Sequence, residues 1–176
     1  MRKVTLFIAM SLDGYIADVN GGVNWLGGQE PDGEDMETYN EFIKSVDTVI
    51  MGYHTYHQIT AELSPDIWPY EDLLTYVMTH RELPETEEIK FMDMDICELV
   101  RDLRQKEGNG IWICGGASII QPLLQDNLID TYHISIMPVI LGKGISLFRE
   151  ADKDLKLKLI KSQSYNGITD VIYQRR

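Results

Sequence analysis

The apolar residues of this chain fall into short runs separated by polar and glycine-containing segments. The first run, Val4 to Ala9, is nearly continuous and rich in β-prone residues, which is typical of a strand buried on both faces. The segment from Asp13 to Gly33 is polar and rich in glycine. Loops of that length are uncommon in compact domains unless they bind or cover something, and a surface excursion without such a role is the alternative.

The later runs alternate between the period of a helix and that of a strand. Helical spacing predicts helices over 34–44, from about Thr55, over 96–106 and over 117–125. Shorter β-prone runs predict strands over 47–51, 73–78, 111–114 and 130–139, with a further short strand at 89–91. The last two runs, 155–164 and 169–174, predict a hairpin that turns at Asn166-Gly167.

This order of elements predicts an α/β fold with three layers. Strands that alternate with helices form a mainly parallel sheet flanked by helices, and the closing hairpin adds an antiparallel edge to it. We find neither an internal repeat nor a linker, so residues 1–176 are expected to form a single domain.

Composition narrows the classes of partner. Acidic residues outnumber basic ones by 28 to 16, which gives a net charge of −12 and disfavours binding to nucleic acids or anionic membranes. A small anionic ligand remains compatible, because a helix N-terminus and one or two cations suffice for a phosphate. Cys97 and Cys114 are too few for a disulfide framework, and the first apolar run is too short to span a membrane, so we expect a cytoplasmic protein.

One segment has the features of an anion site. Gly115-Gly116 lies between a predicted strand and a predicted helix, where glycine lets the backbone approach a ligand and the first helical amides face it. Ser118 adds a hydroxyl near the start of that helix. A tight turn without a ligand explains the pair of glycines equally well.

Two further strand ends carry groups that suit a phosphate. Gly52 and His54 precede Thr55, which we expect to cap the following helix. Thr79, His80 and Arg81 follow the next strand, although a solvated loop is the commoner place for a single arginine. In open α/β sheets ligands bind at the carboxyl ends of strands, so the three segments together are more specific than any one alone.

These segments, with the opening 8–17 and with Pro138 to Gly144, give the chain a clear family resemblance. Over its whole length it resembles the dihydrofolate reductase-like superfamily, and most closely the branch with the C-terminal reductase domain of riboflavin biosynthesis. The Ser-Leu-Asp-Gly motif at 11–14 and the Pro-Val-x-Leu-Gly motif at 138–142 are typical of that branch.

The resemblance implies that the chain binds NADPH in an extended conformation. Ala9 and Ile16 would flank the nicotinamide, and Thr79, His80 and Arg81 would surround the adenosine 2′-phosphate. The pyrophosphate would lie between two turns, whose residues are Gly52, His54 and Thr55 in one and Cys114, Gly115, Gly116, Ala117, Ser118 and Ile119 in the other. Many relatives have arginine where this chain has Tyr53, so NADH is also possible. Relatives often have a cis Gly–Gly peptide, which predicts one at Gly115–Gly116.

Hydride transfer to a C=N or C=O bond also needs a proton source. The carboxylate that dihydrofolate reductases place shortly after a tryptophan has no counterpart in register after Trp25, which disfavours folate reduction. Asp13 is our candidate for catalysis or substrate contact, with a turn residue as the alternative. Tyr15 and Trp25 are candidates to stack on a planar substrate, or else they hold the loop. The histidines lack metal-site spacing, and we predict no metal.

The function that we expect from the sequence is hydride transfer from NADPH to a small heterocyclic or carbonyl substrate, either pterin-like or ribosylaminopyrimidine-like. The alternative is a nucleotide-binding or regulatory module that keeps the scaffold without catalysis. The β-rich C-terminal segment and the related branch also lead us to expect a homodimer.

Overall fold

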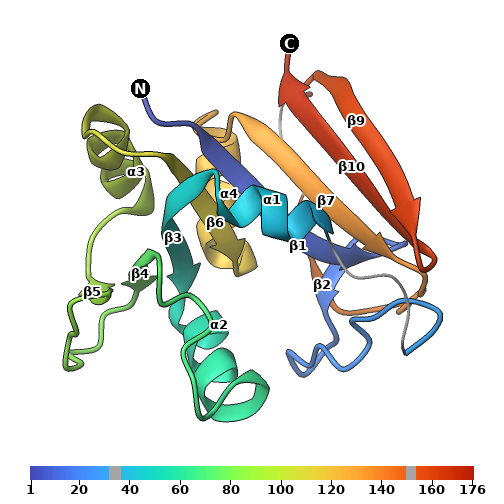
Figure 1. Ribbon diagram of the computed structural model, residues 1–176, viewed down its shortest axis with the longest axis horizontal. Coiled ribbons are helices and arrows are strands. Elements are labelled where there is room, and N and C mark those ends of the chain that lie inside the picture. The colour runs from blue at the N-terminus through green and yellow to red at the C-terminus, as the bar shows by residue number, and fades with distance from the viewer. Residues whose placement is uncertain (32–36, 150–153) are drawn as a thin grey trace.

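The computed structural model describes residues 1–31, 37–149 and 154–176, and within these ranges the chain folds around one eight-stranded sheet (Figure 1). Its strand order is β5-β4-β3-β6-β1-β7-β10-β9. The strands are β1 (Val4–Ser11), β3 (Val46–Gly52), β4 (Leu74–Met78), β5 (Ile89–Met92), β6 (Gly110–Gly115), β7 (Thr131–Met137), β9 (Leu157–Tyr165) and β10 (Ile168–Arg175).

The sheet is parallel from β5 to β7 and antiparallel from β7 to β9, as the sequence predicts. The terminal hairpin turns through Asn166 and Gly167, whose φ angles of 45° and 76° are those of a tight hairpin turn. The predicted fold class is therefore confirmed.

Helices cover both faces of the sheet and complete three layers (Figure 1). On one face α3 (Ile96–Gln105) and α4 (Ala117–Gln125) pack on a core formed by Leu6, Ile113 and their neighbours. On the other face α1 (Glu37–Ile43), α2 (Tyr53–Gln58) and the π-helical turn Ile59–Leu63 cover a cluster around Phe7 and Trp112. Alternation along β6 explains this division, because Trp112 faces the second cluster while its neighbours face the first.

Several element boundaries differ from the prediction. The helix after β3 begins at Tyr53, so Gly52 is the N-cap residue and Thr55 lies within the first turn; the expectation that Thr55 caps this helix is wrong. The long loop contains a short strand, β2 (Tyr15–Ala17), which pairs with β8 (Ile145–Ser146) in a small second sheet that the sequence did not indicate. The predicted start of the first helix, 34–36, lies outside the described residues.

The prediction of a cis peptide bond between Gly115 and Gly116 is also wrong, because this bond is trans. The turn is made instead by positive φ angles of 145° at Gly115 and 31° at Gly116. Only glycine adopts such angles at low cost, so the two glycines reverse the chain between β6 and α4 without a cis bond.

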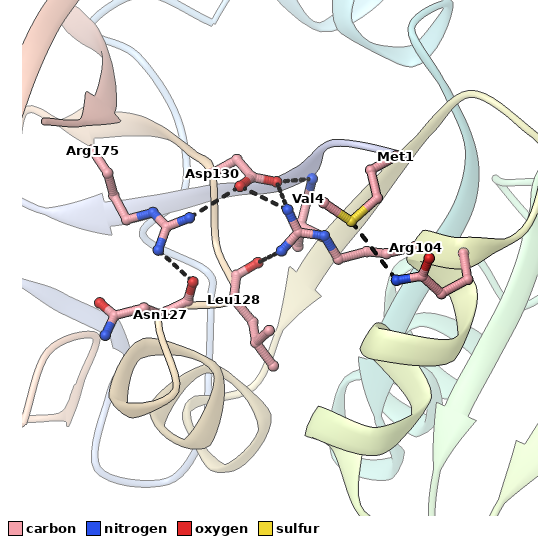
Figure 2. Close-up of polar contacts among 8 residues, drawn as sticks. Met1, Val4, Arg104, Asn127, Leu128, Asp130 and Arg175 are labelled. Carbon is pink, nitrogen blue, oxygen red and sulfur yellow. Dashed lines mark hydrogen bonds and ion pairs between the residues drawn. The ribbon is translucent and has the colours of Figure 1, made fainter.

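A cluster of ion pairs lies at the amino ends of the parallel strands, and both termini of the described chain lie at this end of the sheet (Figure 1). Figure 2 shows Asp130 between the guanidinium groups of Arg104, from α3, and Arg175, from β10, at 3.1 and 3.2 Å. Asp130 also accepts a hydrogen bond from the Val4 amide at 2.9 Å. The cluster therefore joins the beginning, the middle and the end of the chain.

The helices in the described part of the chain are all too short or too polar to cross a membrane.

Candidate functional site

The carboxyl ends of the parallel strands bring the two predicted pyrophosphate turns together. A Cβ atom placed on Gly116 would lie 3.7 Å from Thr55 Oγ1 and 3.9 Å from Ser118 Oγ, and one on Gly52 would lie 3.9 Å from Ile119 Cγ2. The starts of α2 and α4 therefore lie close to each other, with the Thr55 and Ser118 hydroxyls beside Gly116. These five residues, from two segments more than fifty positions apart, lie close together, and their role in binding a pyrophosphate stays a prediction.

The start of α4 is suited to hold an anion. Its N-cap residue is Gly116, and no side chain caps the helix. The first amides of a helix have no acceptor inside it, so those of Ala117 and Ser118 are available to an external acceptor, and the helix dipole favours negative charge there. Ser118 is exposed and adds a hydroxyl donor, while Ala117 and Ile119 are buried and fix the helix on the sheet.

The segment after β4 adds a cation beside these turns. Arg81 places its guanidinium 4.6 Å from the centre of the Tyr53 ring, within cation–π range. Tyr53 thus holds a cation from the neighbouring segment. The Thr79 hydroxyl accepts a hydrogen bond from the Arg81 amide at 3.1 Å and fixes this loop.

His80 has an acidic neighbour that the sequence did not suggest. Its Nδ1 pairs with Asp93 Oδ1, a residue that follows β5, and both side chains are exposed. A carboxylate at this position repels a phosphate but accepts hydrogen bonds from ribose hydroxyls. The ends of β4 and β5 therefore present one arginine, which lies on an aromatic ring, and one carboxylate–imidazole pair.

The Cys114 thiol faces away from α4. It packs on the cluster that lies under α1 and α2, where it contacts Tyr70, and burial raises its pKa to about 12. A thiol with so high a pKa is inert near neutral pH. Cys114 can therefore contribute only its backbone to the strand end.

Asp13 lies two residues after the end of β1, and its carboxylate accepts three hydrogen bonds. Its Oδ1 accepts hydrogen bonds from the Ser11 hydroxyl at 2.6 Å and the Leu141 amide at 3.1 Å, and Oδ2 accepts from the Gly142 amide at 2.7 Å. The Ser11 hydroxyl and these amides hold the pKa of Asp13 below its ordinary value. The group is thus ionised near neutral pH, a state that accepts hydrogen bonds but donates no proton.

The first loop folds back over this edge and is held at several points. Gln58 of α2 donates to the Gly21 carbonyl at 3.0 Å, and the Asn166 side chain bonds both backbone groups of Glu30 at 2.8 Å. Trp25 donates from Nε1 to the Gly22 carbonyl at 3.1 Å, and Tyr15 pairs with Ser146 in the small sheet. These contacts hold the loop in place, which is the second role that the sequence left open for Trp25 and Tyr15.

Ala9 and Ile16 lie on different elements near this loop. Ala9 is half-buried in β1, and half-buried Ile16 of β2 packs against the core on the α3 and α4 side. Their position beside a nicotinamide stays a prediction, as does the role of the other site residues.

Sequence reasoning missed a set of buried polar residues beneath α1. His133, Ser135 and Asp170 are at most 3% exposed, and they lie on one face of β7 and β10. Polar residues at alternate positions of the apolar run 130–139 were the available signal, since alternation places positions 133 and 135 on the same face.

Comparison with known proteins identifies relatives over the whole length of this fold. The family model described as the RibD C-terminal domain matches residues 2–171. The chain is 36% identical over 175 residues to YwjB of Bacillus subtilis (strain 168), a match that covers 99% of this chain and 98% of YwjB.

Solved structures are similar over the same span. A Shewanella sp. PV-4 protein assigned to riboflavin biosynthesis is 30% identical, with a TM-score of 0.84 and coverage of 99% of both chains. The Thermotoga maritima deaminase and 5-amino-6-(5-phosphoribosylamino)uracil reductase is 17% identical, with a TM-score of 0.72; the match covers 99% of this chain and 57% of that one. The second likeness is one of fold.

Proposed function

Since the chain belongs to the RibD C-terminal domain family, we propose that it is a reductase that uses NADPH or NADH to transfer a hydride to a small heterocyclic or carbonyl substrate. The observation that carries this proposal is the pairing of two helix N-termini, with Gly52 and Thr55 facing Gly116 and Ser118, at the carboxyl edge of the sheet. Such an arrangement is suited to a pyrophosphate.

The residues at this edge fit a dinucleotide. The Ala117 and Ser118 amides and the Thr55 and Ser118 hydroxyls are donors for the pyrophosphate, and a Cβ at Gly116 would narrow the space between them. Arg81, on the Tyr53 ring, supplies a cation for the adenosine end. When bound, the reduced cofactor supplies the hydride, while the protein's part is to orient it and to exclude water.

We propose that the chain distinguishes weakly between the two cofactors. Arg81 favours the 2′-phosphate of NADPH, whereas Asp93 beside His80 favours the free ribose hydroxyls of NADH. Replacement of Asp93 by Asn removes the repulsion, so it should strengthen NADPH binding several-fold and leave NADH binding nearly unchanged.

For the substrate we propose a planar heterocycle that carries a C=N or C=O bond, of the pterin or ribosylaminopyrimidine kind. The Thermotoga maritima protein is named as a reductase of 5-amino-6-(5-phosphoribosylamino)uracil, and that compound is the first to test, with 7,8-dihydrofolate as the second. Asp13, which follows β1, is proposed to contact the substrate as a hydrogen-bond acceptor, and Tyr15 and Trp25 of the first loop are proposed to stack on its ring.

The test is a titration of the protein with NADPH and NADH, followed by nicotinamide fluorescence, and then an assay of both substrates. We expect saturable binding of at least one cofactor and its oxidation in the presence of a substrate. Gly116→Ala should weaken binding without unfolding the protein. No binding of either cofactor would refute the proposal, and binding without oxidation across a broad substrate panel would favour a nucleotide-binding module.

We further propose that the protein is a cytoplasmic homodimer. The outer strand β9 exposes Leu159 and Ile160 at 50% and 48%, and an edge strand with exposed apolar side chains is suited to pair with a second copy. Light scattering at micromolar concentration should give the dimer mass, and Leu159→Asp should give the monomer mass. A monomeric wild-type protein would refute this.

A further inference from the structure

Two open cavities lie at the amino ends of the parallel strands, beside the ion pairs of Asp130 (Figure 2). The larger, of about 500 Å³, is lined by Asn127, Asp154, Leu155, Lys156, Arg175 and Arg176. The smaller, of about 250 Å³, is lined by residues 1–3, Thr131 and Gln174 and by Arg104, Asp130 and Arg175. The two cavities share Arg175 and are therefore adjacent, and together we call them the amino-end groove.

The groove concentrates positive charge in an acidic protein. The chain has 16 basic and 28 acidic residues, yet six basic residues and only two acidic ones, Asp130 and Asp154, line the groove. The six are Arg2, Lys3, Arg104, Lys156, Arg175 and Arg176. Arg2 is paired with Asp47, which leaves five cations against two carboxylates. An anion therefore meets a local excess of cations here, although the net charge of the whole protein is −12.

Contacts with the backbone hold three of these cations in place. The Arg176 amide donates to the Lys156 carbonyl at 3.1 Å, so these two residues lie opposite each other at the open end of the β9–β10 hairpin. The Arg176 side chain donates from Nε to the Leu157 carbonyl at 3.0 Å, and the Arg175 guanidinium donates to the Asn127 carbonyl. Side chains that are already ordered lose little conformational entropy when a ligand binds.

Asp130 does not use all the donors of its two arginines. One carboxylate balances one of the two guanidinium charges, and each guanidinium has more N–H groups than the acceptors around it use. Arg104 Nε and the Tyr132 hydroxyl are buried without a hydrogen-bond partner among the described residues. Burial raises the pKa of Tyr132 to about 12, and its hydroxyl is close enough for the charges of Arg175 and Asp130 to act on it. The described residues therefore leave this polar cluster incompletely paired.

The groove is separate from the candidate site, which lies at the other end of the sheet. The parallel strands run from the groove to the edge where Gly52 and Gly116 lie close together. β1 has eight residues and spans about 25 Å, at about 3.3 Å per residue. A small ligand in the groove therefore does not touch the residues proposed to hold the dinucleotide.

We propose that the amino-end groove binds a small phosphorylated molecule through its phosphate, with Lys156, Arg175 and Arg176 as the cations that hold it. A guanidinium matches a phosphate in bidentate geometry, and a lysine adds a point charge. The larger cavity has the volume of a small-molecule site, and Leu155 is the one apolar residue among the described residues that line it, which suits a hydrophilic ligand. The inference is independent of the proposed reduction, because it uses no residue of that site.

Amide NMR with inorganic pyrophosphate as the probe tests the location. The protein is used without a tag, because both termini lie at this end of the sheet (Figure 1). We expect saturable shifts at amides 127, 155–157, 175 and 176 that sodium chloride at equal ionic strength does not reproduce. Shifts that sodium chloride reproduces would overturn the proposal. Shifts confined to amides 53–55 and 117–118 would also overturn it, while supporting the proposed dinucleotide site, so the two proposals can fail separately.

Substitutions test the named cations. Arg175→Gln should weaken pyrophosphate binding in the groove about tenfold, and Lys156→Ala should weaken it several-fold. Lys156 is exposed, so its variant keeps the test valid if Arg175→Gln, which loses the pair with Asp130, does not fold. The matched control is Lys161→Ala, which removes an exposed β9 lysine outside the groove and should bind like the wild type. Wild-type affinity in Lys156→Ala would overturn the proposal.

Thermal denaturation tests whether the phosphate of a small molecule is the group recognised. A ligand that binds only the folded state raises the denaturation midpoint. Ribose 5-phosphate and adenosine 5′-monophosphate are compared with ribose and adenosine, in the wild type and in Lys156→Ala. We expect at least one phosphate compound to raise the wild-type midpoint above its parent, and to raise that of Lys156→Ala less. If neither does so, or if the variant gains as much as the wild type, the proposal is overturned.

Discussion

Gly116 has a φ of 31° and a ψ of 153°, a conformation that a residue with a side chain rarely adopts. The space around it is not closed, because an added Cβ would be 3.7 Å or more from its nearest neighbours. Gly116→Ala should therefore lower the free energy of unfolding by about 1–2 kcal/mol through backbone strain alone. Urea denaturation measures this loss.

The control for this residue is Gly27→Ala, where an added Cβ has nothing within 4 Å. Its effect on the free energy of unfolding should stay within about 0.5 kcal/mol. Equal losses in the two variants would contradict the assignment of strain to Gly116.

The Asp13 carboxylate joins the end of β1 to the segment after β7, through the Leu141 and Gly142 amides. Asp13→Ala removes both acceptors, so hydrogen exchange at these two amides should become faster. Asp18→Ala is the matched control, since Asp18 accepts from Asn20 and Gly22 within its own loop and should affect only those amides. Unchanged exchange at 141 and 142 would mean that other contacts order this segment.

Among the elements, the β9–β10 hairpin does more than close the sheet. Its turn residue Asn166 bonds the backbone of Glu30 in the first loop through its side chain, and that of Gln29 through its carbonyl. Asn166→Gly keeps the positive φ that the turn needs but removes the two side-chain bonds. We expect a loss of about 1 kcal/mol in stability and faster hydrogen exchange at the Glu30 amide.

The Gln29 amide is the internal control for that experiment, because the Asn166 carbonyl that accepts from it at 2.9 Å is unchanged in the variant. Equal acceleration at both amides would indicate that the whole turn had loosened rather than that two bonds had been lost.

The sequence pattern predicted some elements of the fold and missed others. Short, continuous apolar runs predicted the strands of the large sheet. Strands that are buried on both faces are apolar throughout, and they end at glycine or polar residues. The pairing of β2 with β8 was missed. These strands have only three and two residues, too few to show an alternating pattern, and they lie more than a hundred positions apart in the sequence. The turn at Gly115 and Gly116 was placed correctly but given the wrong peptide geometry, because two glycines permit several ways to reverse the chain.

Candidate site residues were predictable where they follow a strand. Gly52, Thr55, Gly116 and Ser118 meet because parallel strands end at one edge. Contacts that depend on side-chain direction were not predictable. The Cys114 side chain packs against the cluster around Phe7 and Trp112 and away from α4, and the Arg81 guanidinium stacks on the Tyr53 ring. Pairings such as that of His133 with Asp170 join distant strands, and a single sequence has no local signal for them.

At the scale of the whole molecule, the buried carboxylate of Asp170 makes stability depend on pH. Its pKa is lower in the folded protein than in the unfolded chain, since His133 and Ser135 outweigh the effect of burial. The stabilisation is therefore fully present above the ordinary carboxyl pKa of about 3.9 and is lost as the pH falls through the lower, folded value. We expect urea denaturation from neutral pH to pH 2 to show that the free energy of unfolding falls less steeply with decreasing pH in Asp170→Asn than in the wild type.

The same variant should lose about 1–3 kcal/mol at neutral pH, because a buried hydrogen-bonded carboxylate is replaced by an amide. If the free energy of unfolding falls equally steeply with decreasing pH in the wild type and the variant, the pH dependence comes from other carboxylates.

The position of β1 has a consequence for synthesis on the ribosome. The first strand of the chain is paired on both sides in the finished sheet, with Val4 beside Ile111 on β6 and Thr5 beside Thr131 on β7. Both partners are translated more than a hundred residues later, and until then this apolar strand has no sheet to join. The nascent chain must therefore be kept from aggregation until β7 leaves the exit tunnel, because native pairing of β1 on both sides requires β6 and β7.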